Sequence, residues 1–289
     1  MNLPPTLLSS QTQGQGHATT VVMLHSSSGS SAQWGALLSS LASDAVNCIA
    51  PDLHGHGRSP AWPEPARDTL ALDADAAWRS VAWSSRDVHL VAHSYGAAVA
   101  LQMALMQPGR VASLTLYEPV PFGLLQAHGK DAAALVEIEI IAERVGAWLD
   151  AGRTLEAARL FTDYWAGSGA FALLQAPQRA RIAERMPTVR RHFNALFAVQ
   201  WSAPQLRRLT MPVMLLRGTT TREPARALAS RLATLLPTAH SVTLPGAGHL
   251  GPISHATMAT PMLAWHLRSC LRGVQVPTRR SAALHRLAA

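Results

Sequence analysis

The segment VHLVAHSYGAAVAL (residues 88–101) constrains the fold of this chain more than any other. It begins with an apolar, β-branched run that is typical of a buried strand and continues into alanine-rich sequence that is typical of a helix. Ser94 lies where the strand changes to the helix, and the small residues Ala92 and Gly96 flank it at −2 and +2. Such a turn needs small neighbours, because bulky ones would collide across it, and it lifts the serine hydroxyl above the sheet edge. Ser94 is therefore a candidate nucleophile, although a serine that merely caps an ordinary helix fits the same pattern.

Strand and helix patterns alternate on both sides of this segment. Short apolar runs predict strands, and longer segments with helical spacing predict helices between them. This order predicts right-handed crossovers and a parallel sheet covered on both faces by helices. Residues 1–20 show no clear strand or helix pattern, so the sequence leaves open whether they form the first strands of the sheet. The predicted strands are 21–25, 46–51, 88–92, 111–117, 211–217 and 240–244, and the predicted helices are 34–41, 70–83, 95–107, 224–235 and 256–270.

Strand patterns stop between residues 119 and 210, and helical spacing replaces them. Ile138, Ile141, Val145 and Trp148 recur every three or four residues, which gives one apolar helical face. Further helical patches follow at 154–165 and 178–197. We therefore expect a helical insertion between two consecutive strands of the sheet.

The length and composition favour a soluble globular protein. A chain of 289 residues, 48% of them apolar, can bury the core of one large α/β domain. Two cysteines, Cys48 and Cys270, are too few for a disulfide framework and indicate a reducing compartment. The first residues show no signal-peptide pattern, and no apolar run reaches the length of a membrane span. These features predict a cytoplasmic protein that does not enter a membrane.

The charge is distributed unevenly along the chain. Residues 185–289 hold fourteen arginines and a single acidic residue, Glu223, whereas residues 1–184 hold more acidic than basic residues. A basic half can bind nucleic acid, which would show as a steep dependence on salt. The arginines are scattered, however, and no nucleic-acid motif contains them. We therefore expect a small-molecule substrate rather than a nucleic acid.

Three segments together resemble the α/β-hydrolase superfamily: HSYG after a strand, PDLHGHGRS before it and LPGAGHLGP near the end. The resemblance covers about residues 20–270. It implies an α/β-hydrolase fold, with a mostly parallel central sheet flanked by helices and a helical lid inserted after the sixth family strand. The implied organisation is a core in two parts, 1–118 and 211–272, a lid at 119–210 and a flexible basic tail at 273–289. Family members use a serine, an acid and a histidine in that chain order, with two backbone N–H groups as an oxyanion hole.

The resemblance points to His249 as the catalytic histidine. It lies in the glycine-rich loop PGAGH, just after a predicted strand, and such a loop can bring an imidazole back over the strand ends. In the family-like loops, His54, His56 and His93 are expected to be structural. No cysteine or carboxylate spacing completes a metal site with the nearby histidines, so neither a metal nor a cofactor is expected.

The acid of the triad departs from the common pattern of the family. Most members place an aspartate three residues after the glycine that ends the seventh strand, but here Gly218 is followed at that spacing by Thr221. Glu118, at the end of the sixth family strand, is our preferred acid, because some relatives carry their acid there. Glu223 is the alternative acid, and a site without a functional acid also stays open.

The oxyanion hole is expected in the loop LHSSSGSSAQW. His25-Ser26 replaces the usual His-Gly, and Ser26 lacks the freedom of glycine at positive φ, so this loop is expected to be shaped differently. The implied donors are the backbone N–H groups of Ser27 and of Tyr95, the residue after the nucleophile. Asp52 in PDLHGHGRS is expected to be scaffold.

These features predict a hydrolase that uses Ser94, His249 and Glu118 on a small, apolar ester, thioester or lactone. Two alternatives use the same pocket: hydrolysis of a C–C bond or acyl transfer, and a ligand-binding homologue without turnover. The fold alone names no substrate, because one fold hosts many reactions. The sequence also leaves open whether the protein forms a homo-oligomer.

Overall fold

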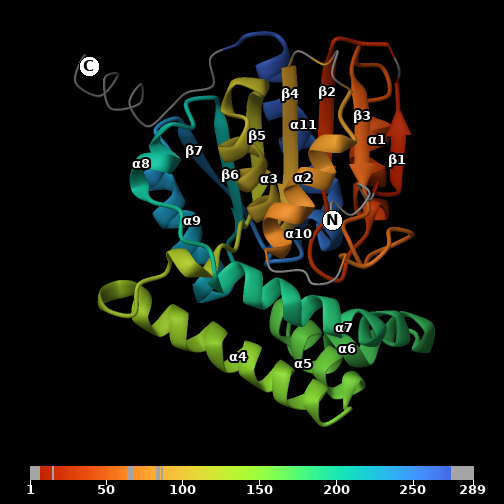
Figure 1. The fold of residues 1–289 in the computed structure, drawn as a ribbon, viewed down its shortest axis with the longest axis vertical. Helices are drawn as coiled ribbons and strands as arrows, with labels where there is room; N and C mark the ends of the chain where they lie inside the picture. Colours follow the sequence, from red (N-terminus) through yellow and green to blue (C-terminus); the bar gives the residue numbers. More distant parts are fainter. Residues whose placement is uncertain (1–6, 15, 64–67, 83–84, 86, 275–289) are drawn as a thin grey trace.

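The computed structural model describes residues 7–274, apart from 15, 64–67, 83–84 and 86. Its centre is a seven-stranded sheet with the order β1-β3-β2-β4-β5-β6-β7 (Figure 1). Only β1 runs antiparallel to its neighbour, β3, and all other neighbours are parallel. The strands are β1 (Ser10–Gln13), β2 (Thr19–Leu24), β3 (Asn47–Pro51), β4 (Asp87–His93), β5 (Val111–Tyr117), β6 (Val213–Gly218) and β7 (Ala239–Leu244).

The central strands are apolar on both faces because helices cover both sides of the sheet. In β2, Val21 and Met23 pack into one core and Val22 and Leu24 into the other, as the alternation of side chains along a strand requires. The first core lies against α1 and α11, and the second against α2, α3 and α9. These helices, with the short α10, are α1 (Gly35–Ser40), α2 (Thr69–Arg79), α3 (Tyr95–Met106), α9 (Glu223–Leu235), α10 (Gly251–Ser254) and α11 (Ala256–Leu271).

Between β5 and β6 (residues 118–212) the chain forms a helical insertion. Its helices α4 to α7 lie together beyond one end of the sheet, the lower end in Figure 1. The buried residues of α4 include Ile138, Ile141 and Val145, three members of the apolar face seen in the sequence. The helices of the insertion are α4 (Ala132–Asp150), α5 (Thr154–Ala166), α6 (Ala170–Leu173), α7 (Ala176–Phe197) and α8 (Ala203–Arg207).

Residues 1–20, which predict no element, contain one strand that sequence patterns missed. In β1, SQTQ has four polar residues, none of them buried, so neither alternation nor an apolar run marks it. Its pairing with β3 places it at the sheet edge. Residues 275–289 of the predicted tail lie outside the described residues. No helix of the described chain is long and apolar enough to cross a membrane.

Candidate active site

Ser94 occupies a strained turn between β4 and α3. Its φ of 57° and ψ of −120° lie outside the usual regions for a residue with a side chain. The turn is tied to the next strand by a bond from Ser94 N to the Tyr117 carbonyl, 3.0 Å long. A Cβ at Gly96 would lie 2.4 Å from the His25 carbonyl oxygen and 2.5 Å from that of Leu24. The glycine two residues after the serine is thus needed because the backbone of β2 passes directly against it.

Three side chains from different strand ends form a continuous hydrogen-bonded chain. His249 Nε2 lies 2.8 Å from Ser94 Oγ, and His249 Nδ1 lies 2.7 Å from Glu118 Oε2. All three residues are buried. Because a carboxylate accepts from Nδ1, the proton of a neutral imidazole is held at Nδ1, and Nε2 faces the serine hydroxyl as an acceptor. The structure therefore brings together Ser94, His249 and Glu118, the three residues that the sequence predicted as a triad.

Glu118 is held by donors from the neighbouring strand. Its Oε1 accepts from Gly218 N at 2.7 Å, and its Oε2 accepts from the Thr221 hydroxyl at 2.5 Å. Glu118 itself has a positive φ of 42°. Sequence reasoning excluded Thr221 as an acid, but it missed that this threonine would orient the acid from the strand next to it. The sequence did carry a signal for this contact. Thr221 lies three residues after Gly218, where most family members carry their acid, and a side chain at that position is expected to point towards the histidine.

The alternative acid, Glu223, lies elsewhere. It is the first residue of α9, is partly exposed and forms an ion pair with Arg226, one turn along the same helix. No hydrogen bond or ion pair joins it to His249 within the described part of the chain. The geometry thus favours Glu118 over Glu223.

The loop that carries His249 is fixed from below by two residues of the central strands. His93 donates from Nε2 to the His249 carbonyl at 2.7 Å, and the Tyr117 hydroxyl donates to the Gly248 carbonyl at 2.7 Å. Burial holds the pKa of His93 well below its usual value, so this histidine is neutral. From above, the Trp165 ring of α5 lies against the His249 ring, with centroids 4.0 Å apart. The imidazole is therefore held between the sheet and the helical insertion.

The predicted oxyanion loop presents two unused backbone donors. Neither Ser27 N nor Tyr95 N donates to an acceptor within the described residues. The positive φ of this loop falls on Ser28, at 62°, and not on Ser26. Arg185, in α7, donates from Nη1 to the Ser28 carbonyl at 2.6 Å and to the Gly29 carbonyl at 3.0 Å. A side chain of the insertion thus holds a strained loop in place.

A second side chain of α7, His192, also reaches the loop. Its Nδ1 lies 2.7 Å from Ser27 Oγ, and its ring stacks on that of Tyr95 with centroids 3.5 Å apart. The Tyr95 hydroxyl in turn donates to Asp73 at 2.7 Å. Burial, the largest cause, lowers the pKa of His192 well below its usual value, so the imidazole is neutral. The sequence signal for it was its position between Val189 and Leu196, on the buried face of a helix.

The remaining residues singled out in the sequence have structural contacts. Asp52 accepts from Ser31 N at 2.7 Å and from Arg58 N at 3.1 Å, which fixes the loop after β3. His54 is hydrogen-bonded to Asp73, and His56 Nε2 accepts from Ser28 N. No group of three or more metal-binding side chains occurs among the described residues.

A small cavity of about 20 Å³ lies directly over Ser94. Ser27 and His192 supply its other polar side chains, and apolar side chains supply the rest. Those apolar residues come from the start and the helices of the insertion: Val120, Phe122, Phe161, Trp165, Val189, Phe193 and Leu196. The space that adjoins the serine hydroxyl is therefore small and largely apolar.

Comparisons with known proteins concern the sequence and the fold. A sequence model described as the alpha/beta hydrolase family matches residues 21–259. The acetyltransferase component of the acetoin cleaving system of Cupriavidus necator is 40% identical over 109 residues, 37% of this chain and 28% of that protein. A probable lysophospholipase of Arabidopsis thaliana, BODYGUARD 2, is 38% identical over 118 residues, 37% of this chain and 25% of that protein. These matches span only about a quarter of the length of either relative.

Among solved structures, MenH from S. aureus superposes with a TM-score of 0.72, covering 91% of this chain and 98% of that one. The two sequences are 17% identical, so this likeness concerns the fold alone.

Proposed function

The chain belongs to the alpha/beta hydrolase family, and we propose that it is a serine hydrolase of small, apolar carboxylic esters. The observation that carries the proposal is the unbroken chain of hydrogen bonds from Glu118 through His249 to Ser94. Backbone strain supports it. The non-glycine residues with positive φ in the described chain are Ser28, Ser94 and Glu118, and all three lie in this site. Strained residues cluster at functional sites, because the surrounding structure must hold them there.

The arrangement suits acyl transfer through a covalent intermediate. Ser94 Oγ would attack the ester carbonyl carbon while His249 Nε2 takes the hydroxyl proton, and Glu118 would stabilise the imidazolium that forms. The carbonyl electrons move onto oxygen, where the N–H groups of Ser27 and Tyr95 can donate to the oxyanion. When the oxyanion collapses, the C–O bond to the alcohol breaks and His249 returns its proton to the leaving oxygen.

Water would complete the cycle by the same groups in reverse. His249 takes a proton from the water as its oxygen attacks the acyl carbon, and the bond to Ser94 Oγ then breaks. The protonated His249 gives its proton back to Ser94, and the carboxylic acid leaves. Each step uses only the ester, water, and side-chain and backbone groups of this chain.

The cavity supports a small acyl group, and we propose that the helical insertion acts as a lid. A cavity of about 20 Å³ leaves little space beside Ser94, and its walls are mostly apolar. Because Phe161, Trp165 and Phe193 come from the insertion, a substrate enters only if these helices or their side chains move.

Fluorophosphonate labelling and hydrolysis of p-nitrophenyl esters test this proposal directly. We expect the wild type to be labelled and to hydrolyse acetyl and butyryl esters faster than octanoyl esters. Ser94→Ala should lose both labelling and turnover while keeping the circular dichroism of the wild type. A folded wild type that is neither labelled nor active on any of these esters would contradict the proposal.

We also expect Arg185 to be a positioning residue for the oxyanion loop. In Arg185→Ala, the Ser28 and Gly29 carbonyls lose their donor, the strained loop relaxes and the Ser27 N–H moves from its position. Because only one oxyanion donor is disturbed and not removed, kcat should fall by about tenfold with KM nearly unchanged.

Two further variants separate positioning from a general structural effect. Arg185→Lys keeps a cationic donor within reach of the two carbonyls and should recover most of kcat. Arg181→Ala removes an exposed arginine one turn earlier in α7 and should behave as the wild type. A fall in kcat of the same size in Arg181→Ala, or no recovery in Arg185→Lys with equal stability, would argue against this role.

A further inference from the structure

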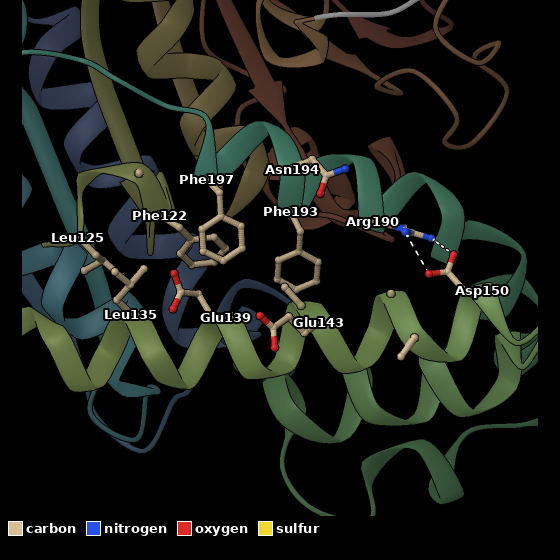
Figure 2. A pocket seen from close by; sticks show the side chains of 14 residues that line it. Phe122, Leu125, Leu135, Glu139, Glu143, Asp150, Arg190, Phe193, Asn194 and Phe197 are labelled. Atoms are coloured by element: carbon tan, nitrogen blue, oxygen red, sulfur yellow. Dashed lines mark hydrogen bonds and ion pairs between the residues drawn. The ribbon is translucent and has the colours of Figure 1, made fainter. Parts of the chain in front are cut away.

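A second and much larger cavity lies on the other side of the wall of the catalytic cavity. This groove of about 720 Å³ runs between α4 and α7, beside the segment that follows β5 (Figure 2). Its volume is within the range of about 300–1,000 Å³ that small-molecule sites occupy. It is far larger than the cavity over Ser94, so the groove can hold a part of a ligand that the catalytic cavity cannot.

Phenylalanine side chains form one wall of the groove and separate it from Ser94. The ring centroids of Phe122 and Phe193 are 6.1 Å apart, and those of Phe122 and Phe197 are 5.2 Å apart. Phe122 and Phe193 line both the groove and the catalytic cavity. These two buried rings therefore stand between the two spaces, and a change of their rotamers would open a passage at this point.

The opposite wall carries two carboxylates, Glu139 and Glu143, at exposed positions of α4. Figure 2 shows Glu139 directed from α4 toward Phe122 and Phe197, with Glu143 one turn further along the helix below Phe193. Neither carboxylate forms an ion pair or hydrogen bond with another side chain in the described parts of the chain. Like charges four residues apart on a helix destabilise it slightly, so the pair has a small local cost.

The cation nearest to these carboxylates in the groove is already paired. Arg190 of α7 binds Asp150 through both terminal nitrogens, with distances of 2.5 and 3.3 Å, at the far end of the groove. Its charge is thus compensated by Asp150. The groove therefore combines an aromatic wall with two free carboxylates.

We propose that this groove binds an organic monocation, the alkylammonium end of an ester whose carbonyl lies at Ser94. An alkylated ammonium gains from the faces of aromatic rings and from nearby carboxylates at once, whereas a neutral chain gains only from burial. The inference rests on the proposed function as far as the ester is concerned: the acyl end stays the small, apolar group beside Ser94, and the cation is added at the alcohol end. Binding of the cation to the groove rests on the walls of the groove alone.

Matched pairs of substrates test the selectivity. Acetate esters of alcohols that end in a trimethylammonium group are compared with isosteres that end in a tert-butyl group, over a series of chain lengths. In the wild type, kcat/KM should favour the cationic ester at the chain length that reaches the groove. Glu139→Gln and Glu143→Gln should each reduce this preference by about threefold, the size of an exposed charge contact. Added salt should reduce it as well.

The control keeps the change of charge but moves it out of the groove. Glu156→Gln removes a carboxylate of α5 that is paired with Arg153 and does not line the groove. This variant should keep the full preference for the cationic ester. An equal loss of preference in Glu156→Gln would overturn the proposal, because the preference would then depend on the net charge of the protein and not on the carboxylates of the groove.

Binding without turnover separates the two proposals. Benzyltrimethylammonium is titrated into Ser94→Ala, and into Ser94→Ala that also carries Glu139→Gln and Glu143→Gln, with calorimetry as the readout. The dissociation constant should rise by about tenfold when both carboxylates are removed. If no ester is hydrolysed but this difference is found, the proposed function fails and the cation site stands. If esters are hydrolysed but the affinities are equal, or the cation does not bind, the groove proposal is wrong.

Discussion

Replacing Glu118 by glutamine is expected to lower kcat by about 10⁴-fold. The amide keeps the shape of the side chain, but its NH₂ group donates to His249 Nδ1, where the carboxylate accepts. The imidazole proton then moves to Nε2, and this nitrogen no longer accepts the proton of Ser94. The loss of negative charge also removes the partner of the imidazolium. Stopped-flow and steady-state hydrolysis of a p-nitrophenyl ester measure the effect.

Glu223→Gln is the matched control for this experiment, because Glu223 is the acid that the sequence left as an alternative. Its ion pair with Arg226 is partly exposed, and its loss should change kcat by less than about twofold. A double variant, Glu118→Gln with Thr221→Asp, should recover part of the lost rate, since the Thr221 hydroxyl lies 2.5 Å from Glu118 Oε2. A kcat of Glu118→Gln within tenfold of the wild type would mean that Glu118 is not the acid of this site.

The second large effect is a loss of stability in mild acid. Burial lowers the pKa of His25, His89 and His266 to about 4, well below the usual value of 6.5. When folded, these residues bind fewer protons than in the unfolded chain, so their contribution to stability is complete above pH 6.5 and is lost as the pH falls towards 4. Each histidine should lower the free energy of unfolding by about 2 kcal/mol between pH 7 and pH 5. The three together should lower it by about 5–6 kcal/mol, which is comparable with the whole stability of many proteins.

Urea unfolding followed by tryptophan fluorescence at pH 7, 6 and 5 measures this dependence. His89→Asn should keep a bond to the Ser113 hydroxyl and remove one titrating group, so the change between pH 7 and pH 5 should become smaller by about 2 kcal/mol. His128→Gln, at an exposed position, should leave the change as it is. An unfolding free energy that stays constant down to pH 5 would contradict the lowered pKa values.

Much of the fold and of the candidate triad could be predicted because the relevant signals are local. Consecutive residues form the strand, turn and helix around Ser94, and consecutive residues also form the glycine-rich loop of His249. The parallel sheet followed from the alternation of strands and helices, which the structure confirms. Glu118 was preferred because it ends the predicted strand where some relatives of the family carry their acid.

The parts that were missed depend on contacts between distant residues. Arg185 and His192 are separated from the oxyanion loop by about half of the chain, and nothing in their own sequence states which loop they meet. The role of Thr221 depends on the register between β5 and β6. The edge strand β1 was missed for a different reason, because polar side chains on an exposed edge leave no pattern of hydrophobicity.

The meeting of Glu118 and Thr221 has a consequence for how such a site changes over generations. Two adjacent strand ends meet at Glu118 Oε2, which lies within hydrogen-bond distance of both the Thr221 hydroxyl and His249 Nδ1. A carboxylate gained at position 221 would therefore enter the surroundings of the histidine while the one at 118 is still present. While both are present, the two acids would share a proton and a single negative charge would remain beside the histidine. If Glu118 is the acid of this site, its position could pass from one strand end to the other through a two-acid intermediate, without a stage at which the histidine has no acid beside it.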